Sequence, residues 1–514
     1  MYERVSSDEP EAGMARALEP HAAGARVLLI DLNNFSRYPT IAIGYLAAAL
    51  RGAGMHIDVL SPLAHGVNGV VREPPETRLL HAGRKLNYRL THANGFLARL
   101  VRAAIDSTRE RSAKRDQQRI GELAQSIDLA GYDAVMISAY LMYRPACELI
   151  GRACERAGVP MIVGGSYFAN AEVAGAWLDL PGLTALVGGE VELEIPQIVN
   201  AVCQRRSIST WPGLWQPGGK GSVRAPLTDL DAVAFPDYRD FPWHRYPNRI
   251  IPMITGRGCG WGVCTFCSDV TSTAGRTFRS RSPGNVLDEL AFQSQRFDTA
   301  SFVFTDLKLN SDLRVWEALL RDFPQRVADP CWIGSVHVDA DAPNGLGAVE
   351  LKQARRAGAV RLTTGLESGS QRVLDAWAKG TDLASTSAFL KAARDADISV
   401  RVTMIHGAPS ERAADVVASA KYLEAHADCI DRVNLNRFQV MIGPRFLERY
   451  DQRASRYPTI DITARDPATA SAEHVHRLAS DRSFRRATAR LLNAVHAINR
   501  KRLGNVARDF EGVM

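Results

Sequence analysis

The chain has 514 residues, of which 46% are hydrophobic and 23% are charged, as expected for a globular protein of two or three domains. No segment approaches the roughly 20 uninterrupted apolar residues of a membrane span, and the N-terminus lacks a signal peptide's basic and apolar regions. We therefore expect a cytoplasmic protein that does not enter membranes. The net charge is +7, but the excess is mostly arginine dispersed among acidic residues, which argues against a nucleic-acid partner.

Two stretches, residues 99–119 and 482–502, are locally basic and have helical spacing. This pattern favours solvated helix faces over a site for an acidic partner. Residues 1–24 are predicted to be a flexible tail.

From Ala25 onward, strand-like and helical segments alternate. Strands are predicted at residues 25–31, 56–60, 133–138, 160–164 and 183–187, and helices at 42–53 and 146–157. This alternation predicts a parallel sheet with helices on both faces, which makes residues 25–204 a Rossmann-like domain. Ligands of such sheets bind at the carboxyl ends of the strands, where this sequence has turns rich in glycine and small polar residues. These turns suit a large planar or phosphorylated ligand, although tight turns need glycine in any case.

Two further segments interrupt the pattern. An insertion of about seventy residues, 63–131, separates the second and third strands and is helical in its second half, with no role assigned. Residues 205–249 are rich in proline and tryptophan and are predicted to be an interdomain linker.

Residues 250–267 run from a short apolar strand into a glycine-rich loop with three cysteines, Cys259, Cys264 and Cys267. Three thiols leave no even pairing, so a metal or iron–sulfur site is favoured over a disulfide framework, with free buried cysteines as the structural alternative. A structural zinc site needs further ligands that the downstream sequence lacks. A plant-type [2Fe–2S] centre shares the Cys-x4-Cys-x2-Cys spacing but needs a fourth cysteine, and the next one is Cys331. Three thiolates on a four-iron cluster would leave one iron open.

After this loop the alternation resumes over residues 250–445. Six strands, counting the one before the cysteines, predict a partial barrel of β/α units with functional groups at the strands' carboxyl ends. Polar residues at those ends are Asp306, His337, Asp339, Glu367, Ser368, His406 and Gln439. The remaining cysteines considered, Cys147, Cys154, Cys331 and Cys429, are interpreted as buried structural thiols.

The loop from Arg257 to Cys267, followed by Phe-Arg-Ser-Arg-Ser-Pro at 278–283 and Gly-Leu-Glu-Ser-Gly-Ser at 365–370, resembles the radical S-adenosylmethionine (radical SAM) superfamily. Within it, the chain is similar to the branch with an N-terminal cobalamin-binding domain. The family's usual loop is Cys-x3-Cys-x2-Cys, so the first gap here is one residue longer. The flanking glycines can absorb the extra residue.

The resemblance implies that Cys259, Cys264 and Cys267 hold a [4Fe–4S] cluster whose fourth iron is chelated by S-adenosylmethionine. Residues implied to bind S-adenosylmethionine are Phe266, Gly365, Glu367, Ile405 and Gly407, and we add Asp306 and Ser368 to this set from their positions at strand ends. Residues implied to bind cobalamin are Asp31, Asn33, Ser138, Tyr140, Gly164, Gly165, Gly188, Gly189 and Glu190. The chain has no Asp-x-His-x-x-Gly motif, so we expect cobalamin without a histidine ligand; a domain that no longer binds cobalamin is the alternative.

The expected fold is α/β: an N-terminal Rossmann-like (flavodoxin-like) cobalamin-binding domain, a partial (β/α)6 TIM-type radical SAM barrel, and a helical C-terminal region at 446–514. The resemblance implies cleavage of S-adenosylmethionine to a 5′-deoxyadenosyl radical and methylation of an unactivated carbon of a secondary metabolite or peptide. Radical rearrangement, cyclisation or ring contraction is the second hypothesis, and a non-enzymatic sensor the third. An external low-potential electron donor of the flavodoxin or ferredoxin type is implied. Catalytic residues, substrate identity and oligomeric state stay open.

Overall fold

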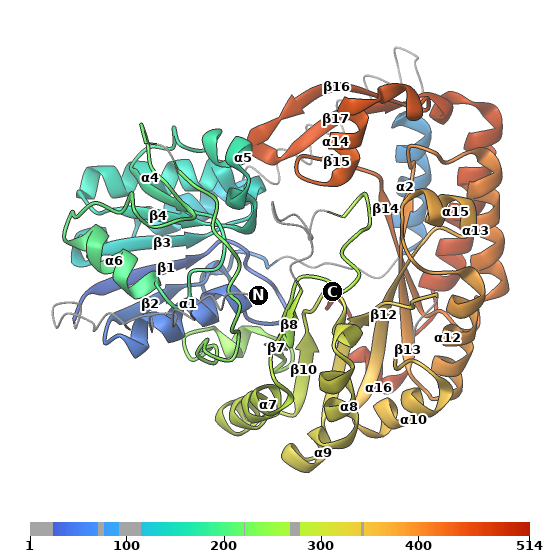
Figure 1. The fold of residues 1–514 in the computed structure, drawn as a ribbon, viewed down its shortest axis with the longest axis horizontal. Helices are drawn as coiled ribbons and strands as arrows, with labels where there is room; N and C mark the ends of the chain where they lie inside the picture. Colours follow the sequence, from blue (N-terminus) through green and yellow to red (C-terminus); the bar gives the residue numbers. More distant parts are fainter. Residues whose placement is uncertain are drawn as a thin grey trace, which may run out of the picture.

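The computed structural model describes residues 24–69, 77–91, 115–219, 221–267, 278–340 and 344–513. Two parallel sheets stand on either side of the molecule, and a small antiparallel sheet near the C-terminus lies above the space between them (Figure 1). The predicted tail, residues 1–24, lies outside the described residues except for Gly24. Among the described helices, none has the length and apolar character needed to cross a bilayer.

The N-terminal sheet has the strand order β2-β1-β3-β4-β5-β6, in which only the short edge strand β6 is antiparallel. The order from β2 to β5 is that of flavodoxin-like proteins, so the predicted Rossmann-like fold is confirmed. Alternate residues of β1 enter two different apolar clusters, Val27 and Leu29 in one and Leu28 and Ile30 in the other. Both faces of the sheet are therefore covered, which explains why its strands are continuous apolar runs.

The strands of this sheet are β1 (Arg26–Asp31), β2 (His56–Leu60), β3 (Ala134–Ser138), β4 (Met161–Gly164), β5 (Leu183–Val187) and β6 (Leu214–Trp215). Its helices are α1 (Ile41–Gly52), α4 (Arg144–Ala157), α5 (Ala171–Gly175) and α6 (Ile195–Cys203). The predicted strand and helix positions agree with these bounds to within two residues.

The second sheet has the order β14-β13-β12-β11-β10-β7 and is parallel throughout, as predicted for a partial barrel. Its strands are β7 (Ile251–Met253), β10 (Ser301–Phe304), β11 (Cys331–Val336), β12 (Ala359–Glu367), β13 (Ser399–His406) and β14 (Arg432–Arg437). Its helices are α7 (Pro283–Phe297), α8 (Leu313–Arg321), α9 (Phe323–Arg326), α10 (Ala348–Arg356), α11 (Gln371–Ala376), α12 (Leu383–Asp395) and α13 (Ala413–Ala425). Figure 1 shows the longer of these helices along the outer side of the curved sheet.

The C-terminal region is not only helical, and this part of the fold prediction was wrong. Residues 440–476 contain an antiparallel sheet of the order β15-β17-β16, made of β15 (Val440–Met441), β16 (Ile460–Asp466) and β17 (Ser471–His476). The remaining elements are helical: α14 (Arg445–Gln452), α15 (Arg482–Asn499) and α16 (Asn505–Arg508). Most residues of β16 are polar and at least partly exposed, so the strand lacks the apolar run that marked the others.

This small sheet contacts both larger domains. The indole nitrogen of Trp177 donates a hydrogen bond of 2.8 Å to the carbonyl of Ala468, and the amide of Phe446 donates one of 2.8 Å to Thr265 in the cysteine loop. Tyr238, in the predicted linker, packs against Gly44 of α1. Its hydroxyl donates a hydrogen bond of 2.9 Å to the carbonyl of Pro252 in β7. Contacts of both kinds therefore help to join the domains.

The last described residues, 507–513, pack against the strands of the barrel. Phe510 and Val513 join an apolar cluster with Val303 and Val360 of the barrel strands. Two fully buried arginines of the sheet donate to backbone carbonyls of this segment, Arg361 to those of Ala507 and Phe510 and Arg401 to that of Val513. These carbonyls replace part of the hydration that the guanidinium groups lose on burial.

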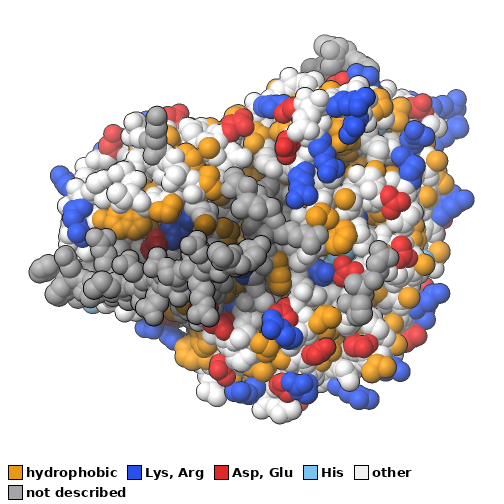
Figure 2. All heavy atoms as spheres, viewed as in Figure 1, with side chains coloured by type: hydrophobic (Ala, Val, Ile, Leu, Met, Phe, Trp, Pro, Cys, Tyr) orange, Lys and Arg blue, Asp and Glu red, His pale blue; other side chains and the backbone are white. Residues whose placement is uncertain are grey.

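Basic side chains are distributed over the surface rather than gathered. On the face drawn in Figure 2, Lys and Arg side chains lie scattered over the barrel and the small sheet, with Asp and Glu among them. The basic stretch 482–502 includes α15, which buries Phe484, Leu491 and Val495 and leaves Arg482 exposed. Of the insertion, α2 (Arg78–Thr91) reaches α15, where His81 and His496 stack at a centroid distance of 3.9 Å.

Two glycines test the packing of the N-terminal domain. A Cβ added at Gly151 of α4 would lie 2.0 Å from the carbonyl oxygen of Pro181, whereas one at Gly52 of α1 would meet no atom within 4 Å. We expect Gly151→Ala to destabilise the protein by about 1–3 kcal/mol through overpacking. Gly52→Ala serves as the control and is expected to stabilise by roughly 0.5–1 kcal/mol, because alanine favours helix. Urea unfolding would measure both; equal midpoints for the two variants would contradict the described packing of α4.

Candidate functional site

The cysteine loop leaves the carboxyl end of β7 and lies between two short paired strands. These are β8 (Gly256–Arg257) before the loop and β9 (Arg279–Ser280) after it, in antiparallel register. All three cysteines are partly exposed and none forms a disulfide. Gly258 and Gly262 have φ of +81° and +59°, values that residues with a side chain rarely adopt. Glycine is therefore needed where the loop starts and between its first two cysteines.

The chain entering the loop is held by Asp306, which follows β10. Its buried carboxylate accepts hydrogen bonds from the amide and hydroxyl of Thr255, at 2.9 and 2.7 Å, and from the amide of Gly256, at 3.0 Å. Burial raises the pKa of Asp306 to about 6, although these hydrogen bonds act in the opposite direction. In this structure Asp306 braces the loop, and its expected contact with S-adenosylmethionine stays a prediction.

Trp261, which lies within the longer first gap, anchors the loop to the barrel. Its indole nitrogen donates to the carbonyl of Ala378 at 2.8 Å, and its ring stacks on His337 with centroids 6.1 Å apart. A Cβ at Gly380 would lie 2.1 Å from the indole ring, so this glycine makes room for it. Sequence reasoning noted the long gap but missed this anchor, which depends on a contact more than a hundred residues away.

A buried ion pair, Lys379 with Glu367, lies beside the loop. The sequence predicted only the glutamate as a site residue. The ammonium of Lys379 is 3.2 Å from Oε1 of Glu367, and both residues are 7% exposed. Burial alone would lower the pKa of Lys379, but Glu367 and the thiols of Cys264 and Cys267 raise it above its ordinary value. Glu367 was predicted from its strand-end position, whereas Lys379 lies in the turn between α11 and α12 and has no such signal.

This pair brings several predicted residues together. Lys379 lies 6.0 Å from the ring centroid of Phe266, so the residue between the second and third cysteines shares its surroundings. Glu367 has φ of +57°, at an irregularity of β12, and a Cβ at Gly365 would lie 2.3 Å from its carboxylate. Left-handed backbone at a non-glycine residue is costly and is often found at functional sites. The end of β12 is thus shaped to aim a carboxylate toward the cysteine loop.

The other residues predicted for S-adenosylmethionine lie next to β12. Ser368 is fully buried, and its hydroxyl is 3.3 Å from that of Ser419. Ile405 is partly exposed in β13, which pairs with β12, and Gly407 follows with φ of +86°. The amide of Gly407 donates to the buried carboxylate of Glu411 at 2.7 Å, which fixes the turn at the end of β13.

The residues predicted for cobalamin lie at the carboxyl edge of the N-terminal sheet. Asp31 is buried and accepts hydrogen bonds from the hydroxyl of Thr40, at 2.9 Å, and from the amide of Asn33, at 3.1 Å, and burial raises its pKa to about 6. The side-chain amide of Asn33 donates to Ser138 at 3.4 Å. Asp31 and Asn33 therefore shape the turn after β1, whereas the side chain of Tyr140 is 41% exposed.

The predicted glycines are close to other backbone. A Cβ at Gly188 would lie 2.2 Å from the backbone of Phe168, and one at Gly165 would lie 2.8 Å from the carbonyl of Ala139. Gly189 has φ of +111°, and Gly164 ends β4 with no atom closer than 3.8 Å to such a Cβ. Packing thus explains Gly165 and Gly188 without a ligand. The last predicted residue, Glu190, is paired with Arg279 through hydrogen bonds of 2.8 and 2.9 Å.

Among the described residues, no three His, Cys, Asp or Glu side chains are close enough together to hold a single metal ion. In an iron–sulfur cluster of four irons, each cysteine binds a different iron. The Sγ atoms of the three cysteines therefore need not converge on one point. The donor set of three thiols beside a buried ammonium suits an anionic cluster in which thiolates bind iron.

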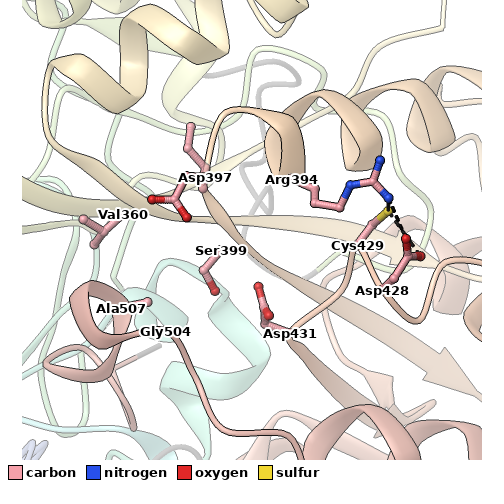
Figure 3. A pocket seen from close by; sticks show the side chains of 10 residues that line it. Val360, Arg394, Asp397, Ser399, Asp428, Cys429, Asp431, Gly504 and Ala507 are labelled. Atoms are coloured by element: carbon pink, nitrogen blue, oxygen red, sulfur yellow. Dashed lines mark hydrogen bonds and ion pairs between the residues drawn. The ribbon is translucent and has the colours of Figure 1, made fainter.

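A cavity of about 260 Å³ lies elsewhere, at the amino ends of the barrel strands (Figure 3). Ser399 begins β13 there, Asp431 precedes β14, and the guanidinium of Arg394 pairs with Asp428 at 2.5 Å. Functional groups of β/α barrels lie at the opposite, carboxyl ends of the strands. The cavity is therefore separate from the cysteine loop.

Comparison with known proteins agrees with this geometry. The sequence of residues 253–423 matches the radical SAM superfamily, over a segment that includes the cysteine loop, Glu367 and Gly407. Residues 253–423 form a radical SAM domain. The prediction of a radical SAM domain is thereby confirmed for this segment of the chain.

Curated relatives match the chain over about half of its length. An uncharacterised methyltransferase from Pyrococcus horikoshii is 26% identical over 253 residues, which cover 48% of this chain and 53% of the relative. The anaerobic magnesium-protoporphyrin IX monomethyl ester cyclase of Rubrivivax gelatinosus is 25% identical over 249 residues, which cover 46% of this chain and 43% of the cyclase. The chain thus spans about half the length of the curated relatives it matches.

Two solved structures share the fold of nearly the whole chain. TsrM from Kitasatospora setae, a radical S-adenosylmethionine methyltransferase with cobalamin and a [4Fe–4S] cluster bound, has a TM-score of 0.63 and 15% identity, and the match covers 92% of this chain and 91% of TsrM. OxsB, a cobalamin-dependent radical enzyme with aqua-cobalamin bound, also has a TM-score of 0.63 and 15% identity, with coverage of 90% and 66%. At these identities the likeness concerns the fold alone, and it agrees with the predicted fold, in which a Rossmann-like domain precedes a partial barrel.

The bracing role of Asp306 can be tested with a substitution that exchanges a single heavy atom. In Asp306→Asn the oxygen Oδ1 can keep its three hydrogen bonds, but Oδ2, which lies 3.1 Å from the amide nitrogen of Thr255, becomes an NH2 donor that faces another donor. We expect a loss of about 1–3 kcal/mol of stability, since the hydrogen bonds also lose the negative charge of their acceptor. Asp312→Asn is the matched control, because asparagine is an equally good helix N-cap and Asp312 caps α8. Thermal unfolding of both variants measures the difference, and the same melting temperature for both would contradict the bracing role.

Proposed function

We propose that this protein is a cobalamin-dependent radical SAM enzyme that methylates an unactivated carbon of a small-molecule or peptide substrate. The observation that carries the proposal is the braced loop of three cysteines beside the buried Lys379–Glu367 pair, within a chain that has the fold of TsrM and OxsB over nearly its full length.

The three cysteines would hold the [4Fe–4S] cluster. Their side chains are partly exposed and form no disulfide, and glycines give the loop the backbone freedom to fold around an inorganic group. Lys379 adds a fixed positive charge near Cys264 and Cys267, which stabilises thiolates over thiols. When bound, the cluster supplies the electron that cleaves S-adenosylmethionine.

The end of β12 and the turn after β13 would hold S-adenosylmethionine. That molecule carries an ammonium, a carboxylate and ribose hydroxyls, which need acceptors and donors of both charges. Glu367 offers carboxylate oxygens, and Lys379 offers a buried ammonium 3.2 Å away. Phe266 and Ile405 offer partly exposed apolar surface for the adenine. The Lys379–Glu367 pair keeps both charges in place before the ligand arrives, so binding requires little rearrangement.

Cobalamin would lie against the carboxyl edge of the N-terminal sheet. Large apolar side chains are exposed there, with Tyr140 at 41% and Met142 at 62%, and Phe35 lies 6.4 Å from the ring of Tyr140. Exposed apolar surface of this kind on a folded domain marks a binding site. A planar corrin ring would cover it, and the turn Asp31-Leu-Asn33 supplies no histidine to bind cobalt from below. When bound, cobalamin supplies the methyl group.

Cyclisation or rearrangement without methyl transfer is the second candidate. The observation that favours it is the match to the Rubrivivax gelatinosus cyclase, at nearly the same identity as the match to the methyltransferase from Pyrococcus horikoshii. An external low-potential electron donor of the flavodoxin or ferredoxin type is part of either proposal.

The deciding experiment is anaerobic reconstitution with iron, sulfide and cobalamin, followed by incubation with a reductant and S-adenosylmethionine. Ultraviolet–visible spectra report the bound chromophores, and mass spectrometry reports 5′-deoxyadenosine and S-adenosylhomocysteine. Bound cobalamin together with both products supports methyl transfer. Deoxyadenosine without cobalamin or homocysteine supports the second candidate, and neither product from a protein with an intact cluster overturns both.

The cluster assignment makes a separate prediction. Cys259→Ala, Cys264→Ala and Cys267→Ala each remove one ligand, so each is expected to lose most of the bound iron and all detectable deoxyadenosine. Cys331→Ala and Cys147→Ala are the controls, since these cysteines lie in β11 and α4, away from the loop, and are expected to keep the iron content of the wild type. Iron and sulfide analysis checks all five. A variant of the loop with full iron content would remove that cysteine from the ligand set.

A further inference from the structure

The two arginines that bracket the cysteine loop both reach into the N-terminal domain. Arg257 in β8 precedes the loop, Arg279 in β9 follows it, and the two residues are cross-strand partners. Their guanidinium groups meet Glu190 and Glu192, which lie in the segment after β5. One hairpin thus carries both ends of the loop and both interdomain arginines.

The contacts are specific and partly shielded from water. Arg279 binds Glu190 with two hydrogen bonds, of 2.8 and 2.9 Å, and Arg257 binds Glu192 at 2.8 Å. Arg257 also lies 3.6 Å from Glu190, so the two pairs form one network. Side-chain exposure is between 14% and 20% for all four residues. Paired, bidentate and half-buried contacts of this kind are stronger and more directional than surface ion pairs.

Neighbouring backbone fixes the network in place. Oε2 of Glu190 accepts the amide of Leu227 at 2.8 Å, and Arg279 donates to the carbonyl of the same residue at 3.1 Å. On the other side, the guanidinium of Arg257 lies over the ring of Tyr45 from α1, at 5.3 Å. The network therefore joins three parts of the chain, which are the N-terminal sheet, the linker and the radical SAM domain.

We infer that Arg257, Arg279, Glu190 and Glu192 form an interdomain clasp that sets the position of the N-terminal domain relative to the cysteine loop. In this assignment Glu190 is a positioning residue and does not contact cobalamin. The role of the clasp rests on the proposed function. There, cobalamin held by the N-terminal domain must meet a substrate that is activated at the cysteine loop. Misplacement of reacting groups by about 1 Å can cost on the order of 100-fold in rate.

The first test uses the full chain without cofactors. A compact chain of this length has an expected radius of gyration of roughly 24 Å. Glu190→Arg places three cations together, so small-angle X-ray scattering is expected to give a larger radius of gyration than for the wild type. The double variant Glu190→Arg with Arg279→Glu restores opposite charges and is expected to restore the wild-type value.

The matched control is the ion pair between Glu424 of α13 and Arg490 of α15, which is bidentate at 2.9 and 2.5 Å but does not involve the N-terminal domain. Glu424→Arg is expected to leave the radius of gyration unchanged. An unchanged radius for Glu190→Arg overturns the clasp. So does a double variant that stays as expanded as Glu190→Arg, or a control that expands equally.

The second test reads the distance between cofactors. In reconstituted wild-type protein, the reduced cluster and the cob(II) form of cobalamin are both paramagnetic, and electron paramagnetic resonance is expected to show their magnetic interaction. The interaction is expected to weaken in Glu190→Arg and return in the double variant, at equal cluster and cobalamin content. An equal interaction in all three proteins overturns the clasp. A wild type that does not retain cobalamin contradicts the proposed function instead, and the scattering test then decides the clasp alone.

Discussion

The cysteine loop is fixed at both of its ends, and the remaining features of the site depend on this constraint. Asp306 holds the backbone at Thr255 and Gly256, and the paired strands β8 and β9 bring the two ends of the loop side by side. A loop of this length would otherwise sample many conformations, each with its own arrangement of thiols. Fixing the ends lets three short side chains present a constant geometry to an inorganic group.

The second requirement of the site is charge balance. A buried ammonium is stable only when anions compensate it, and Glu367 supplies one such anion to Lys379. Cys264 and Cys267 supply more when they are thiolates, and an iron–sulfur cluster spreads that negative charge over a larger volume. Trp261 and Gly380 then fix the distance between the loop and the turn that carries Lys379. The first cysteine gap thus has a structural role, since it contains an aromatic side chain that anchors the loop.

Much of this fold could be predicted because its strands are buried on both faces. The predicted bounds of β2 and β5 agree with the structure at every residue, since each is a largely apolar run between turns. The small sheet near the C-terminus could not be predicted in the same way. Strands β16 and β17 have few apolar residues, so no apolar run marks them in the sequence.

The site residues also divide into those that local sequence marks and those that depend on tertiary contacts. The cysteines and Glu367 follow from local sequence, because a strand end or a spacing marks them. Trp261, Lys379 and the partners of Asp306 depend on tertiary contacts, which no local pattern records. Sequence reasoning assigned Asp306 and Glu190 to ligands from their positions, whereas the structure pairs both with protein groups.

The small C-terminal sheet also has a consequence for how the protein folds. Trp177 and Ala468, which join this sheet to the N-terminal domain, are 291 positions apart in the chain. The N-terminal sheet is complete by Trp215, so it can form while the rest of the chain is still being synthesised. Contacts over such separations form slowly, although their entropic cost rises only with the logarithm of the loop length. The apolar surface around Trp177 therefore stays uncovered until the last part of the chain emerges, and this interval is when aggregation competes with assembly.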